Sequence, residues 1–231
     1  MSQTFYSPPL DCGLDIVYCD ESLLVANKPA GLLSVPGRGL DKADSLTTRI
    51  QKEFPDALSV HRLDMSTSGL LVFARGADMH RRLSRLFRER AVMKFYIAIV
   101  SGRVKLTECE VDFPLASDWP NRPRQKVDFA IGKPSLTRYR LLGYMKYPIH
   151  TSMHDGGPGL SASRVELEPV TGRTHQLRVH MAAIGHPVLG DELYGGNAGS
   201  SPGRLLLHAR KLSFVHPLRA ELLALTSEPP F

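Results

Sequence analysis

Two charged residues in a short polar segment, Arg62 and Asp64, are the first candidates for chemistry in this 231-residue chain. The residue pattern predicts that 59–64 is extended and that the polar bend at 66–69 follows it. Alternate side chains of an extended segment share a face, so Arg62 and Asp64 are expected to point the same way. A cation two residues from a carboxylate favours the ionised acid, and a bend can present that acid into a cleft. The alternative is a structural ion pair that ties down the turn.

The sequence around this pair resembles a known motif. The string His-Arg-Leu-Asp at 61–64, followed by Thr-Ser-Gly-Leu-Leu at 67–71, closely resembles the signature of the RluA family of pseudouridine synthases. The aspartate of that motif is the catalytic nucleophile in the family, so the resemblance implies this role for Asp64. It also implies the reaction: the N1–C1′ bond of a uridine in RNA breaks, the uracil turns, and C5 bonds to C1′.

Other segments resemble the family's motifs in the same order, and the resemblance spans about residues 15 to 216. They are Lys-Pro-x-Gly-Leu at 28–32, Lys-x-Tyr-x-Ala at 94–98, Gly-Arg-Thr-His-Gln-Leu-Arg at 172–178, and Arg-Leu-Leu-Leu-His-Ala at 204–209. A shared turn, Gly-His-Pro-Val-Leu-Gly-Asp, lies at 185–191. The prolines and glycines of these motifs are expected to shape turns, with Pro29 and Gly31 in a structural role.

The resemblance implies roles for residues whose pattern alone leaves the choice open. Tyr96 would stack on the reacting uracil and take the C5 proton, although alternation alone favours a core aromatic. Arg173 would pair with the catalytic aspartate and keep it ionised, although the residue alone is equally compatible with a phosphate-binding or surface arginine. The apolar wall of the uracil pocket would consist of Leu205, Leu206 and Leu207.

Two basic stretches suit contact with RNA phosphates. A helix predicted at 78–90 has an apolar stripe on one side and arginines on the other, with few acids to balance them. A loop at 118–127 joins basic residues to the only tryptophan, as in the RluA-type branch that acts on small stem-loops. The basic residues are Arg81, Arg85 and Arg88 on the helix and Arg122, Arg124 and Lys126 in the loop. The alternative for each stretch is a solvated surface.

Arg62 is expected to fill the space that a flipped-out base leaves.

Composition is that of an ordinary globular protein with an excess of cations. The chain has 29 Lys and Arg against 23 Asp and Glu, a net charge of +6 and a pI of about 9.3. Its three cysteines form no CxxC pair, which favours a reducing cytoplasm. We expect neither a signal peptide nor a membrane span, because no apolar run approaches the roughly 20 residues that a spanning helix needs.

The predicted fold class is α+β. The resemblance implies a mixed, mostly antiparallel central sheet flanked by helices, and the pattern adds a hairpin at 15–27 and helices at 44–54, 78–90 and 174–185. Asp44 is the predicted N-cap of the first helix, and Thr174 is expected near the N-cap of the last. We expect a tail at 1–14 and one catalytic domain at 15–231, without the S4-like RNA-binding module that many relatives carry.

The predicted partner is RNA, with stem-loops of the tRNA anticodon arm and of large-subunit ribosomal RNA as substrates. We expect no cofactor, no obligate protein partner and a monomer. His150 and His154 are four residues apart, but the prolines and glycines around them argue against a helix and so against a metal site. Two other functions stay open: an RNA-binding or RNA-folding protein on a synthase scaffold, and a nucleoside hydrolase, whose chemistry also begins at C1′.

Overall fold

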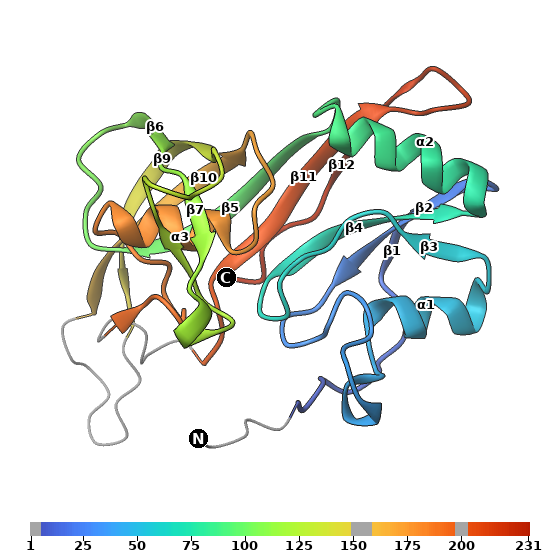
Figure 1. Cartoon of the computed structure of the whole chain (residues 1–231), viewed down its shortest axis with the longest axis horizontal. Helices are drawn as coiled ribbons and strands as arrows, with labels where there is room; N and C mark the ends of the chain where they lie inside the picture. Colours follow the sequence, from blue (N-terminus) through green and yellow to red (C-terminus); the bar gives the residue numbers. More distant parts are fainter. Residues whose placement is uncertain (1–5, 149–158, 197–202) are drawn as a thin grey trace. The chain divides into compact units, whose positions relative to one another are not determined.

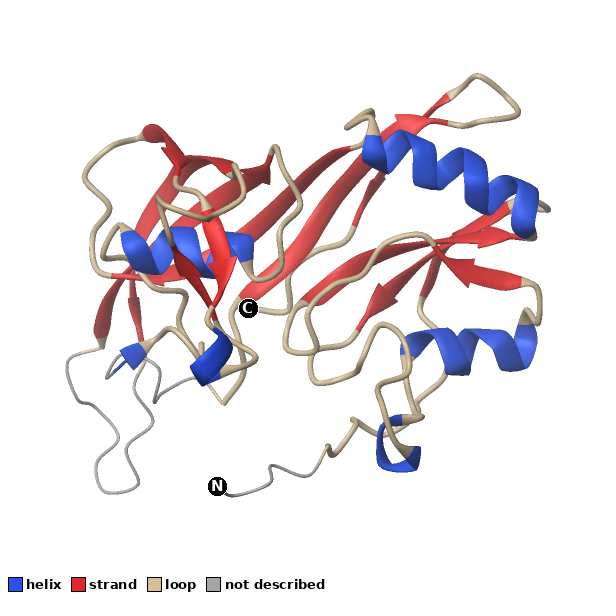
Figure 2. Cartoon of the chain, in the orientation of Figure 1, coloured by secondary structure: helices blue, strands red, loops and turns tan. Residues whose placement is uncertain are grey.

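The computed structural model of the chain describes residues 6–148, 159–196 and 203–231. The chain forms two compact units: unit 1 comprises residues 1–94 and 209–230, and unit 2 comprises residues 95–208 with Phe231. The chain passes between the units within strands β5 (Met93–Ser101) and β11 (Leu207–Val215). Figure 2 shows that strands dominate both units. The described residues also contain three α-helices, so the fold class is α+β.

Unit 1 is built on strands in the order β1-β2-β4-β11, with β3 on β4 and β12 on β11. The bounds are β1 (Ile16–Cys19), β2 (Leu23–Lys28), β3 (Ala57–Ser59), β4 (Ser68–Arg75) and β12 (Leu222–Thr226). The predicted hairpin is confirmed by the antiparallel pairing of β1 with β2. The extended segment predicted at 59–64 is wrong beyond its first residue, because β3 ends at Ser59 and residues 60–67 form a loop.

Strand β4 is buried on both faces, which explains its continuous apolar sequence. Leu70, Val72 and Ala74 form one cluster with Met79 and Leu83 of helix α2 (Ala77–Arg88), so the predicted apolar stripe of that helix is confirmed. Helix α1 (Leu46–Glu53) lies on the other face of these strands, as Figure 1 shows. A short 3₁₀ helix, Leu40–Lys42, precedes it.

The N-cap predicted for the first helix, Asp44, is wrong. Ser45 caps α1, because its hydroxyl accepts a hydrogen bond from the Thr48 amide in a capping box. Asp44 instead forms an ion pair of 2.8 Å with Arg49. Helix α3 (Gln176–Ala183) has His175 as its N-cap, so Thr174 lies next to the N-cap as predicted. His175 adopts the left-handed conformation at φ 54°, and this backbone turn sets the start of the helix.

Unit 2 is built on strands in the order β5-β10-β9-β6, each antiparallel to the next. The bounds are β6 (Glu108–Asp112), β9 (Leu136–Tyr147) and β10 (Leu160–Pro169). One face of these strands packs with α3 into a core that includes Val165, Leu177 and Met181. The rigid loop predicted at 118–127 connects the strands of a hairpin, β7 (Leu115–Ser117) and β8 (Gln125–Val127), and only its last three residues are in a strand. The connection contains a 3₁₀ turn, Trp119–Asn121.

Candidate active site

The loop that carries Asp64 in unit 1 has a fixed backbone. The hydroxyl of buried Ser34 donates to the Leu63 carbonyl at 2.7 Å and accepts from the Leu63 amide at 3.0 Å. The Asp64 carbonyl accepts from the Thr67 amide at 3.1 Å. Asp64 itself is partly exposed and Arg62 is exposed, so the loop presents both side chains on a rigid frame. A rigid frame of this kind is what a carboxylate needs if it is to be aimed at a substrate.

Lys28 at the end of β2 supports the same loop, a role that the sequence did not predict. It is fully buried, and its ammonium donates to the carbonyls of Pro29 at 2.8 Å, Leu32 at 2.7 Å and Met65 at 3.0 Å. The Gly31 amide donates to the same Met65 carbonyl at 2.8 Å. Lys28 therefore joins the 29–32 turn to the residue that follows Asp64. The signal in the sequence was a lysine at the end of an apolar strand, directly before Pro-x-Gly.

His61 anchors the beginning of the loop. Its Nε2 accepts a hydrogen bond of 3.1 Å from the Val72 amide, and its ring stacks on Phe87 with centroids 4.4 Å apart. Burial, with a smaller contribution from the charge of Lys94, lowers the pKa of His61 to about 3. The imidazole is therefore neutral at physiological pH and able to accept from the backbone.

We expect His61 to make the stability of unit 1 depend on pH. The unfolded pKa of about 6.5 exceeds the folded value, so stability is fully present above pH 6.5 and is lost as the pH falls towards 3. Between pH 6.5 and 5 the loss reaches up to about 2 kcal/mol. Urea unfolding of wild-type and His61→Gln protein at pH 7.5 and 5 measures it, because glutamine does not titrate. Equal pH dependence in the two proteins would contradict this role.

Arg173 in unit 2 lies in a turn that is organised by the next residue but two, Gln176. The Gln176 side chain is buried, and its Oε1 accepts from the Thr171 hydroxyl at 2.7 Å and from the Arg173 amide at 3.0 Å. Its Nε2 donates to the Leu136 carbonyl and to Thr137. Arg173 is exposed and donates from Nε to the Pro134 carbonyl at 3.3 Å. The sequence did not predict this role for Gln176, because two of its partners, Leu136 and Thr137, lie about 40 residues away in the chain.

Tyr96 packs against the core cluster that contains two of the three predicted wall residues. It is partly buried against the unit 2 core cluster, to which Leu205 and Leu207 belong. Leu206 belongs to a different cluster, with Ile99 and Leu189, so it lies on the opposite side of the segment. Alternation along an extended segment explains the difference. Leu205 and Leu207, and not Leu206, are the residues of this trio that share the cluster Tyr96 packs against.

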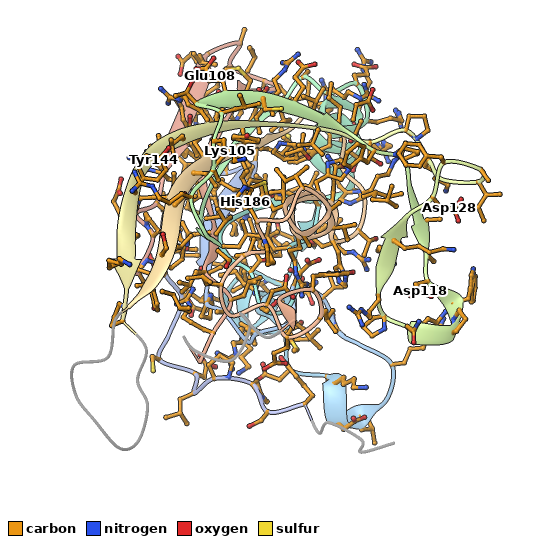
Figure 3. The ribbon with its side chains drawn as sticks, turned by 90° about the vertical axis from the view of Figure 1, so that its left-hand side faces the viewer. Lys105, Glu108, Asp118, Asp128, Tyr144 and His186 are labelled. Atoms are coloured by element: carbon orange, nitrogen blue, oxygen red, sulfur yellow. The ribbon has the colours of Figure 1, made fainter. Side chains whose placement is uncertain are left out.

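The β7–β8 hairpin of unit 2 exposes cations and an aromatic ring together. Trp119 is 68% exposed, and the guanidinium carbon of Arg122 lies 3.2 Å from the centre of its ring. Arg124 and Lys126 are exposed as well, with Lys126 paired to Asp128 at 3.0 Å. Figure 3 shows Asp118 and Asp128 on this hairpin, at one side of the unit. The prediction of a basic surface with an aromatic face is thus matched by the exposure of these side chains.

The outer face of α2 is less basic than the sequence suggested. Asp78 lies 3.2 Å from Arg81, and Glu89 lies 3.2 Å from Arg85. The expectation that Glu89 is the one acid that balances these arginines is therefore wrong for Arg81, which pairs with Asp78. Arg88 is exposed on the same helix. Exposed ion pairs of this kind contribute little stability and open readily, so the arginines stay available to a polyanion.

The structure adds two negative findings for the residues that it describes. Residues 6–148, 159–196 and 203–231 contain no group of three or more His, Cys, Asp or Glu side chains suited to a metal ion. His150 and His154, the pair considered as metal ligands, lie outside this range. Within the same range, no helix has the length and apolar character that crossing a membrane requires.

Comparison with known proteins agrees with these motifs. A family model described as RNA pseudouridylate synthase matches residues 22–183. The chain is 46% identical over 232 residues to the dual-specificity RNA pseudouridine synthase RluA of Pasteurella multocida, with all of both chains covered. It is 48% identical to the protein of the same name from Escherichia coli K12, with 94% of each chain covered.

A solved structure supports the fold as well. Human RNA Pseudouridylate Synthase Domain Containing 1 matches with a TM-score of 0.78 and 33% identity, over 97% of this chain and 87% of that one. The predicted α+β synthase fold is therefore confirmed. The chain belongs to the RluA family of RNA pseudouridine synthases, isomerases that convert uridine to pseudouridine within RNA.

Proposed function

We propose that this synthase modifies uridines in two kinds of stem-loop, the tRNA anticodon arm and a hairpin of large-subunit (23S) ribosomal RNA. The observation that carries the proposal is the match along nearly the whole chain to synthases named for dual specificity. The exposed hairpin of unit 2 supports it, because a short cationic and aromatic element fits the bend of a small RNA loop. Recognition then depends on the shape of the loop more than on a long sequence.

Asp64 is the proposed catalytic residue. As a carboxylate it attacks C1′ of the uridine, or removes a proton from the sugar, while the N1–C1′ bond breaks. The uracil turns and C5 bonds to C1′, after which C5 gives up its proton. Support comes from the frame around the loop, in which Ser34 and Lys28 fix the neighbours of Asp64 on both sides. No atom is imported, so the reaction calls for no cofactor.

The other roles follow the family motifs. Arg173 keeps the carboxylate ionised, and Tyr96 stacks on the uracil and accepts the C5 proton. Leu205 and Leu207 wall the pocket, with support from the cluster against which Tyr96 packs. Arg62 enters the helical stack when the uridine flips out, which costs a few kcal/mol. Its exposed position beside Asp64 supports this role.

Phosphate contacts offset the cost of flipping. The proposed contact residues are Arg81, Arg85 and Arg88 on α2 and Arg122, Arg124 and Lys126 on the hairpin. We propose further that residues 15–231 act together as one catalytic domain, that the enzyme works as a monomer without an obligate protein partner, and that it acts in the cytoplasm, where its RNA substrates are made.

Tritium release tests the proposed function. The wild-type protein should release tritium from 5-tritiated uridine in an anticodon stem-loop and in a 23S hairpin, because C5 loses its hydrogen when it bonds to C1′. The control RNAs carry cytidine at the target position and should release none. Free uracil among the products would indicate a nucleoside hydrolase instead. Tight binding without release from either RNA would indicate an RNA-binding protein on a synthase scaffold.

A further inference from the structure

The turn that follows the shared motif at 185–191 is fastened to helix α3. Asp191 is fully buried and forms two hydrogen bonds with Arg178 of the helix, at 2.8 and 2.7 Å. The same carboxylate accepts from the amides of Leu193 at 3.0 Å and Tyr194 at 3.1 Å. A buried ion pair with this many hydrogen bonds holds the backbone around it in one conformation. Tyr194 therefore has a defined position relative to α3.

The hydroxyl of Tyr194 joins two elements that the proposed function uses. It accepts a hydrogen bond of 2.8 Å from the amide of Gln125, the first residue of β8. It lies 2.8 Å from Nδ1 of His175, to which its own proton can be donated. His175 is the residue before α3 and lies two positions after Arg173. One phenol therefore connects the basic hairpin to the turn that presents Arg173.

We propose that Tyr194 is a positioning residue for RNA binding, which acts by holding the β7–β8 hairpin in the orientation that grips a stem-loop. The inference rests on the proposed function. A two-stranded ribbon is only marginally stable by itself, so its attachments decide how well it is ordered. Other backbone attachments lie at the base of the hairpin, where Leu115 pairs with Lys133. Gln125 lies towards the tip of the hairpin, next to Arg124. A hydrogen bond at Gln125 therefore restricts the position of the neighbouring basic residues more than a bond at the base does.

Preorganised cations bind a polyanion more tightly, because less ordering entropy is lost in the complex. Tyr194→Phe keeps the ring and removes only the hydroxyl. We expect KM for the stem-loop RNA to rise about fivefold, while kcat at saturating RNA stays within about twofold. We also expect the Gln125 amide to exchange its hydrogen at least about tenfold faster, with the Leu115 amide unchanged.

Tyr144→Phe is the matched control. The Tyr144 hydroxyl donates to the Val104 carbonyl at 2.9 Å, so this variant loses one phenolic hydrogen bond in the same unit. Figure 3 shows Tyr144 on the side of the unit opposite Asp118 and Asp128 of the hairpin. KM should be unchanged in this variant. Equal KM values for Tyr194→Phe and Tyr144→Phe would overturn the proposal.

A double-mutant cycle shows whether Tyr194 acts through the hairpin. Arg122→Ala with Lys126→Ala raises KM by itself, and adding Tyr194→Phe should then raise it less than twofold further. Independent, multiplicative effects would overturn the proposal. If Tyr194→Phe yields little folded protein, His175→Asn breaks the other half of the junction and must also raise KM selectively. Every change is measured relative to wild-type release, so an inactive wild type would reject the proposed function and not this inference.

Discussion

Replacing Asp64 by asparagine is expected to abolish isomerisation, with tritium release falling at least about 10⁴-fold. Asparagine has nearly the same shape, but it carries no charge and neither attacks a sugar carbon nor removes a proton. The Leu63 backbone is held by Ser34, so the loop should keep its conformation in the variant. Stem-loop RNAs with 5-tritiated uridine, assayed at saturating enzyme, give the rate of the chemical step.

Asp56→Asn is the control for this experiment. Asp56 is an exposed carboxylate of the same unit and pairs with Arg75 at 3.2 Å. Its loss should leave release within about twofold of wild type and stability within about 0.5 kcal/mol. RNA affinity of D64N should also stay within about threefold of wild type, since a carboxylate adds nothing to phosphate binding. Release at the normal rate by D64N would remove Asp64 from the reaction.

Lys28→Met should destabilise unit 1 by about 3 kcal/mol or more. Methionine fills a similar volume but donates no hydrogen bond, so the carbonyls of Pro29, Leu32 and Met65 lose a buried donor. The Met65 carbonyl keeps its bond from the Gly31 amide, whereas the carbonyls of Pro29 and Leu32 are left unsatisfied, and each unsatisfied buried acceptor costs about 1–3 kcal/mol. Urea unfolding monitored by circular dichroism measures the change. Because Met65 follows Asp64, residual folded protein should also lose activity.

Lys52→Met provides the comparison for this variant. Lys52 is 69% exposed and pairs with Asp11 at the surface, so its replacement should change stability by less than about 0.5 kcal/mol. The difference between the two lysine variants isolates the effect of burial from the effect of net charge. Similar unfolding midpoints for both variants would show that the three carbonyls find other donors and that Lys28 does not hold the loop.

The sequence predicted those features that depend on local pattern. Apolar periodicity located the β1–β2 hairpin and the stripe of α2, because burial of one face repeats at a fixed spacing. The buried strand predicted after the motif at 61–64 is strand β4, although the motif itself lies in a loop and not in the predicted extended segment. The family and the α+β fold were both predicted correctly, since several motifs in order carry far more information than composition.

The features that the sequence did not reveal depend on contacts between distant parts of the chain. Lys28 reaches the Met65 carbonyl across 37 positions, and Tyr194 reaches the Gln125 amide across 69. Contacts over such separations produce no periodic pattern in the sequence. The N-cap of α1 was misplaced for a related reason, because Asp44 has a competing partner in Arg49. The left-handed conformation of His175, the N-cap of α3, is likewise not indicated by residue type alone.

The most direct test of the role of Asp64 is a crystal structure of D64N bound to an anticodon stem-loop. We predict that the target uridine is flipped out of the loop and that its C1′ lies within about 3.5 Å of the side chain at position 64, the separation of a near-attack geometry. A flipped uridine whose C1′ lies more than about 8 Å from that side chain would contradict the account, because no carboxylate there could then reach the sugar.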